Sequence, residues 1–166
     1  MKNILILIKR NFLIFFKNRN MNLFLYFLFQ IFFYLFLVVP LSNLFDFIYS
    51  SRMSYTYHSI PSVIFICTSM LALLIPITVI NRDSKNDFLS YIFTTRVTNN
   101  DYFLSVIIYS LICSYIEFII SFFIAIQLSD SGSELGFIIS WNQIFYFSII
   151  IFPSILFFSN LGLFLS

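Results

Sequence analysis

Long apolar runs, each close to the length that a helix needs to cross a bilayer, occupy most of this chain. They are residues 23–41, 60–80, 102–128 and 141–166, and together they carry a single formal charge, that of Glu117. A bilayer core of about 30 Å requires roughly 20 apolar residues in a helix. Because backbone groups in lipid must bond within their own segment, we expect each run to be α-helical.

The composition indicates a membrane protein and leaves little room for a water-soluble domain. Hydrophobic residues make up 60% of the chain and charged residues only 10%, whereas a soluble domain carries about 25% charged residues. At 166 residues, we expect one membrane domain over residues 1–166. The predicted fold is all-α, a polytopic membrane helix bundle of four transmembrane helices plus an N-terminal interfacial amphipathic helix.

The lysines and arginines lie almost entirely on one side of the predicted spans. Eight of them precede the first run or fall between the second and third, whereas the loops on the other side hold only Arg52. Short loops rich in Lys and Arg stay on the cytoplasmic side of a bacterial inner membrane, or on the matrix side of a mitochondrial inner membrane. We therefore expect the N-terminus and the loop 81–101 on that side.

Residues 1–20 form a basic and moderately amphipathic segment. A helical wheel places two sets of side chains on opposite sectors: Lys2, Asn3, Lys9, Arg10 and Lys17 against Leu5, Ile8, Phe12, Phe15 and Phe16, with Ile6 and Leu13 intruding on the polar sector. A helix of this kind lies in the interface plane, with its cations near anionic headgroups. The alternative is an extension of the first span, in which residues 17–20 would make a poor membrane interior.

The inner loop 81–101 is the most informative segment for partners. Ser84 and Asp87 have the spacing of a capping box, which predicts a short cytoplasmic helix over residues 84–94. Its apolar face consists of Phe88, Leu89, Ile92 and Phe93, and its charged head of Arg82, Asp83, Lys85 and Asp87. Two interpretations remain open. The helix is either a connector lying on the headgroups or a docking element whose apolar face enters a groove of a cytoplasmic partner.

Three stretches carry a resemblance to a known family. They are Pro40-Leu41-Ser42 at the end of the first run, Ile60-Pro61 with the small and aliphatic residues 64–74 after it, and Arg82-Asp83 followed by Asp87 and Leu89. These stretches resemble the ABC-2 class of ABC-transporter permeases and, within it, the CcmB family, the permease subunit of the cytochrome c maturation complex (the haem exporter). Phe88 stands where that family has a glycine after the acidic residue. Such permeases usually have more spans, so the resemblance implies a fragment, a split gene or a reduced version.

The resemblance implies a permease subunit that forms a homodimer or a hetero-oligomer. A cytoplasmic ATPase subunit like CcmA would dock on the helix 84–94 through these residues: Arg82, Asp83, Lys85, Asp87, Phe88, Leu89 and Ile92. Membrane proteins like CcmC and CcmD would be further partners, with haem as the cargo. The alternatives are an ABC-2 permease with another substrate and a non-transporting accessory subunit of a membrane complex.

The chain offers few groups for chemistry of its own. It has no Gly-x-x-x-x-Gly-Lys-(Ser/Thr) motif, so we expect ATP to bind a separate subunit. One histidine, His58, and two cysteines in separate runs, Cys67 and Cys113, cannot supply a metal site, and we expect the cysteines to be buried thiols. Because the basic residues flank a membrane, we do not expect nucleic-acid binding. With so few reactive groups, we expect the chain to be neither an enzyme nor the holder of a bound cofactor.

Glu117 is the remaining candidate site residue. A carboxylate at the bilayer centre costs about 2.5–3.5 kcal/mol on insertion scales, so we expect it to face protein or a cavity. Ser114 and Ser121 lie on its face of the helix, at positions that suit hydrogen bonds. Two uses remain open: a polar site in substrate passage or contact between subunits, and a structural polar contact between helices.

Overall fold

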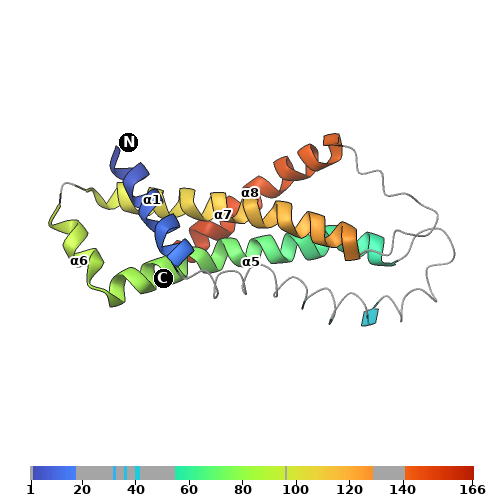
Figure 1. The fold of residues 1–166 in the computed structure, drawn as a ribbon, viewed down its shortest axis with the longest axis horizontal. Helices are drawn as coiled ribbons and strands as arrows, with labels where there is room; N and C mark the ends of the chain where they lie inside the picture. The colour runs from blue at the N-terminus through green and yellow to red at the C-terminus, as the bar shows by residue number, and fades with distance from the viewer. Residues whose placement is uncertain are drawn as a thin grey trace.

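The structure is a computed structural model that describes residues 2–17, 32, 36, 40–41, 55–95, 97–128 and 141–166. Within these ranges the chain forms helices and the turns between them: α1 (Lys2–Lys17), α5 (Tyr55–Lys85), α6 (Phe88–Phe93), α7 (Asn99–Leu128) and α8 (Trp141–Leu165). The long helices α5, α7 and α8 pack against one another, and α1 crosses α7 at one end of this bundle (Figure 1).

Among the described residues, three helices are long and apolar enough to cross a membrane: Pro61–Lys85, Asn99–Phe122 and Phe145–Leu165. The prediction of apolar, membrane-length helices is therefore confirmed for the second, third and fourth runs. The helix of the second run does not end at Ile80, as predicted, but continues to Lys85. It therefore includes the first residues of the predicted inner loop, 81–85. The predicted span 23–41 lies outside the described residues, apart from Phe32, Phe36 and Pro40–Leu41.

Both ends of the chain lie at the end of the bundle where α6 is found (Figure 1). α5 runs toward this end, α7 runs away from it, and α8 returns to it. The basic residues of α1 and of the last turn of α5, which include Arg82 and Lys85, therefore gather at one end. We call this the basic end of the bundle.

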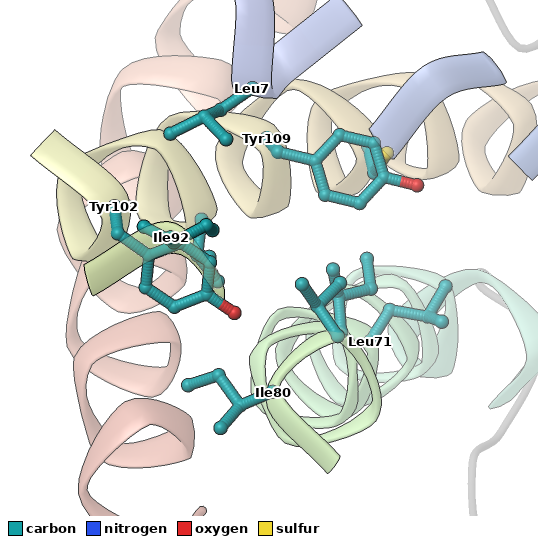
Figure 2. Close-up of a cluster of buried hydrophobic side chains, with 10 residues drawn as sticks. Leu7, Leu71, Ile80, Ile92, Tyr102 and Tyr109 are labelled. Carbon is teal, nitrogen blue, oxygen red and sulfur yellow. The ribbon is translucent and has the colours of Figure 1, made fainter. Parts of the chain in front are cut away.

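A cluster of buried apolar side chains joins α1, α5, α6 and α7 near the basic end. Its members include Leu7, Leu71, Ile80, Ile92, Tyr102 and Tyr109, which converge on the space between these four elements (Figure 2). The ring of Phe12 adds an edge-to-face contact with Tyr109, with ring centroids 5.0 Å apart. Ile92 is only 3% exposed, so the short helix α6 is fixed to the core.

A second cluster of buried apolar side chains, which includes Ile64, Phe118 and Ile155, joins α5, α7 and α8. Small and hydroxyl-bearing side chains add close contacts among the same helices, as is common in membrane bundles. Pro76 lies inside α5, and a proline has no N–H for the carbonyl four residues earlier in the helix. Ser110 Oγ of α7 donates to that carbonyl, the oxygen of Ala72, at 3.1 Å. The same hydroxyl lies 3.0 Å from Ser159 Oγ of α8. One buried serine thus joins three helices and satisfies the group that Pro76 leaves open.

Gly162 brings the backbone of α8 against α5. A Cβ built at this position would overlap the carbonyl oxygen of Leu73. Glycine is therefore the residue that allows α8 to approach α5 this closely.

The capping box predicted at Ser84 and Asp87 does not form, and this corrects the start of the short helix. Ser84 lies inside α5, and α6 follows Asp87, whose side chain makes no capping hydrogen bond. Backbone bonds explain the difference: Asn86 N donates to Arg82 O and Asp87 N to Ser84 O, each at 3.2 Å. These bonds keep residues 82–85 in α5, so the separate helix begins at Phe88 instead of residue 84.

Candidate functional site

A buried carboxylate, that of Asp83, lies where α1, α5 and α7 meet. Asp83 is 0% exposed. Arg10 of α1 binds it with two parallel hydrogen bonds, Nη1 to Oδ2 at 2.9 Å and Nη2 to Oδ1 at 2.8 Å. Arg82 Nε donates to Oδ1 at 3.1 Å, and the Tyr102 hydroxyl donates to Oδ2 at 3.0 Å. Each carboxylate oxygen therefore accepts two hydrogen bonds, from three helices in all.

Two further contacts extend this arrangement. Arg82 Nη2 donates to the side-chain oxygen of Asn11 at 2.9 Å, so consecutive residues of α1 bind the end of α5. The guanidinium carbon of Arg10 lies 3.4 Å from the ring centroid of Phe88 in α6, a cation–π geometry. We call Arg10, Asn11, Arg82, Asp83 and Tyr102 the Asp83 cluster, and its contact with Phe88 connects it to α6.

The Asp83 cluster contains two cations and one anion. A buried carboxylate is tolerated only when charges and hydrogen bonds compensate its desolvation, and both guanidiniums supply these. The side chains of Arg10 and Arg82 are 24% and 27% exposed. The cluster therefore neutralises Asp83 inside the protein and keeps one formal positive charge near the surface.

The predicted docking residues do not form one outward face. Asp83 and Ile92 are buried; Arg82, Phe88 and Leu89 are partly buried; Lys85 and Asp87 are exposed. Phe88 and Leu89 pack against the cluster of buried apolar side chains that includes Ile92. Phe88, Leu89 and Ile92 of the predicted apolar face are thus directed into the chain's own core, which favours the connector over the docking element among the two interpretations left open. Packing against the cluster covers Ile92 fully and Phe88 and Leu89 in part.

α6 and its flanking turns present a different surface to the outside. Its exposed residues are Ser84, Lys85, Asn86, Asp87, Ser90, Tyr91, Thr94 and Thr95, and we call them the α6 outer surface. Tyr91 is its one large aromatic side chain and is 66% exposed. Tyr91 was not among the predicted docking residues, because the helical wheel of so short a helix does not show which of its side chains will be covered.

Glu117 lies in a second polar site, on α7. It is 0% exposed, and Ser121 Oγ donates to its Oε1 at 2.6 Å. Ser114, the other predicted partner, is also buried, but its hydroxyl makes no hydrogen bond to the described residues. At 1.5 Å per residue, Glu117 is about 22 Å along α7 from Tyr102, so this site is separate from the Asp83 cluster.

Arg10, Asn11 and Tyr102 were not predicted to be members of the Asp83 cluster. Arg10 was expected among the headgroup-facing cations, but the buried carboxylate of Asp83 draws it inward. The two residues are 73 positions apart, so no local pattern pairs them. The burial of Asn11 could have been predicted, because Asn11 lies one helical turn after the apolar Leu7, on the same face of the helix, and both are buried.

The groups of the Asp83 cluster are bonded mainly to one another. This arrangement fixes α1, α5 and α7 relative to one another at the basic end and links them to α6 through Phe88.

In comparisons with known proteins, the chain matches no protein-family model, no curated protein and no solved structure.

Proposed function

We propose that this chain is the membrane subunit of an ABC-type transporter, a permease whose ATP is bound and hydrolysed by a separate cytoplasmic subunit. The resemblance of three stretches to ABC-2 permeases supports this proposal. The structural observation that carries it is the place of α6. This short helix connects two membrane-length helices, α5 and α7, and its buried face is fixed to the same core as both.

The Asp83 cluster supplies a route by which movement of α6 reaches the bundle. A displacement of α6 moves Phe88, which stacks on Arg10, and Arg10 is bonded to Asp83 at the end of α5. Tyr102 ties the start of α7 to the same carboxylate. Because packed elements shift as units instead of deforming continuously, a partner that pushes on α6 would move α1, α5 and α7 together.

The partner ATPase would contact the α6 outer surface. Tyr91 is the anchor we expect there, because exposed aromatic side chains dominate binding energy at protein interfaces. Lys85 and Asp87 are exposed beside it and would set the register of the contact. Arg82 and Asp83, which the resemblance assigns to docking, would act from inside by holding α6 in place.

We place the basic end, with the N-terminus and α6, on the cytoplasmic side of a bacterial inner membrane or the matrix side of a mitochondrial one. The chain would work as a homodimer or hetero-oligomer. As a member of a haem exporter it would pair with an ATPase like CcmA and with membrane proteins like CcmC and CcmD. Haem would then be the cargo, delivered for c-type cytochrome maturation.

Capture of the ATPase tests this proposal. The full chain is co-expressed with the CcmA-like ATPase of its own genome and purified through a tag on the chain. Tyr91→Ala should weaken the captured complex by at least roughly tenfold, as an interface anchor does. Tyr146→Ala is the matched control, because Tyr146 is 65% exposed but lies on α8 near the opposite end. Failure of the unaltered chain to capture the ATPase, or equal capture by both variants, would contradict docking at α6.

A non-transporting accessory subunit is the second candidate. The close backbone approach of α8 to α5 at Gly162 is compatible with it, because this contact fixes two of the membrane-length helices to each other. An accessory subunit would capture no ATPase. If the ATPase is captured but deletion of the chain leaves c-type cytochromes intact, an ABC-2 permease for another substrate is the better assignment.

A further inference from the structure

α1 has a second face, directed away from the helices on which it packs. Leu5, Ile6, Leu13 and Phe16 are each between 61% and 65% exposed, and Lys9 and Lys17 are exposed beside them. At roughly 100° per residue, these six side chains occupy a sector of about 120° on the helical wheel. We call this set the α1 outer face.

The opposite side of α1 is committed to the protein. Leu7 and Asn11 are buried, and Phe12 and Phe15 pack against the apolar cluster. Arg10, which the sequence grouped with the lysines, is bonded to Asp83. The α1 outer face therefore contains two lysines and four large apolar side chains. The helical wheel of the sequence did not identify this face, because it divided these side chains between a polar and an apolar sector.

Neither water nor the hydrocarbon core suits the α1 outer face. Four large apolar side chains exposed to water are unfavourable, and so are two ammonium groups in hydrocarbon. The boundary between headgroups and acyl chains satisfies both, because apolar side chains can insert while lysines extend toward phosphates. The position of α1 at the basic end is consistent with that depth.

The charge of this face determines the lipid it fits. α1 has lysines and an arginine but no Asp or Glu, and the adjacent Asp83 cluster retains one formal positive charge. We propose that the α1 outer face binds anionic phospholipids, with the headgroup phosphate at Lys9 and Lys17, in preference to zwitterionic ones. This inference rests on the membrane placement proposed above and is independent of the ATPase partner.

Quenching by brominated lipids tests the preference directly. Leu13→Trp in a Trp141→Phe chain provides a single tryptophan reporter on the α1 outer face, because the sequence has one tryptophan and Leu13 is 61% exposed. The full chain is reconstituted in vesicles of phosphatidylglycerol and phosphatidylcholine, with bromine on the acyl chains of one lipid at a time. Brominated phosphatidylglycerol should be enriched at the reporter, by roughly fivefold per lysine at low salt. A reporter at Ile150→Trp, on an apolar part of α8, should be quenched equally by both lipids.

Two further measurements decide the outcome. Changing Lys9→Gln and Lys17→Gln together should remove most of the preference but keep the quenching, and raised salt should weaken the preference through screening. Lys85→Gln, which removes an exposed cation outside α1, should leave it in place. Equal quenching of the Leu13→Trp reporter by both lipids in the chain with intact lysines would overturn the proposal. Absence of quenching by either lipid would overturn it too. Both results would leave ATPase capture unaffected, so the two proposals fail separately.

Discussion

At the scale of single residues, Asp83 is the group on which the polar contacts of the basic end depend. Asp83→Asn would remove the anion and set an amide donor against guanidinium and phenol donors. Breaking a buried pair costs about 3–5 kcal/mol, and the quarter-exposed arginines favour the lower end of that range. We expect the free energy of unfolding to fall by about 3 kcal/mol, measured by SDS titration in mixed micelles.

Two milder changes calibrate that result. Tyr102→Phe removes one donor to the carboxylate, so we expect a loss of about 1.5 kcal/mol. Lys85→Gln alters an exposed side chain that makes no contact with the Asp83 cluster, so it should leave stability unchanged. An Asp83→Asn chain as stable as the unaltered one would show that the cluster does not stabilise the fold.

Asp87 has a left-handed backbone, with φ of 53°, at the turn between α5 and α6. Aspartate, asparagine and glycine tolerate this conformation, whereas a β-branched residue does not. We expect Asp87→Gly to be neutral or slightly stabilising and Asp87→Val to cost about 1–2 kcal/mol. The same SDS titration measures both, and equal stability of the two variants would exclude strain at this turn.

At the scale of helices, Ser110 and Pro76 should be energetically coupled. Ser110→Ala leaves the Ala72 carbonyl without its donor from α7, and we expect a loss of about 1–2 kcal/mol. Pro76→Ala restores an N–H for that carbonyl within α5. In the Pro76→Ala chain, Ser110→Ala should therefore cost less.

A double-mutant cycle in SDS titration measures this coupling. Ser90→Ala serves as the control, because Ser90 is exposed and its hydroxyl bonds a carbonyl of its own helix segment. Strict additivity of the Ser110 and Pro76 changes would mean that the serine does not compensate the proline.

The helices were more predictable than the contacts between them. Hydropathy is a local property, so the runs at 60–80, 102–128 and 141–166 coincide with membrane-length helices. The pairing of Arg10 with Asp83 and of Ser110 with Ala72 spans 73 and 38 positions, and it depends on how the helices pack. The capping box failed for a local reason instead, because backbone bonds from Asn86 to Arg82 and from Asp87 to Ser84 keep Ser84 in the last turn of α5.

At the scale of the whole molecule, α1 joins two environments. One side of it is bonded and packed to α5 and α7, and the other presents lysines with apolar side chains to the outside. A change in the lipid surface or in α6 would therefore act on the same helix. The basic end is therefore where the proposed ATPase contact and the proposed lipid contact would meet.

Side-specific labelling tests this arrangement of the whole chain. α8 has 25 residues, and a helix of that length spans about 37 Å, so its two ends should face opposite sides of the bilayer. The native Cys67 and Cys113 are buried and should give little background with an impermeant maleimide. Tyr91→Cys and Ser166→Cys, both at the basic end, should react only from the cytoplasmic or matrix side, and Asn142→Cys only from the other. If Ser166→Cys and Asn142→Cys react from the same side, α8 does not cross the membrane. If Tyr91→Cys reacts only from the outer side, α6 cannot meet a cytoplasmic ATPase.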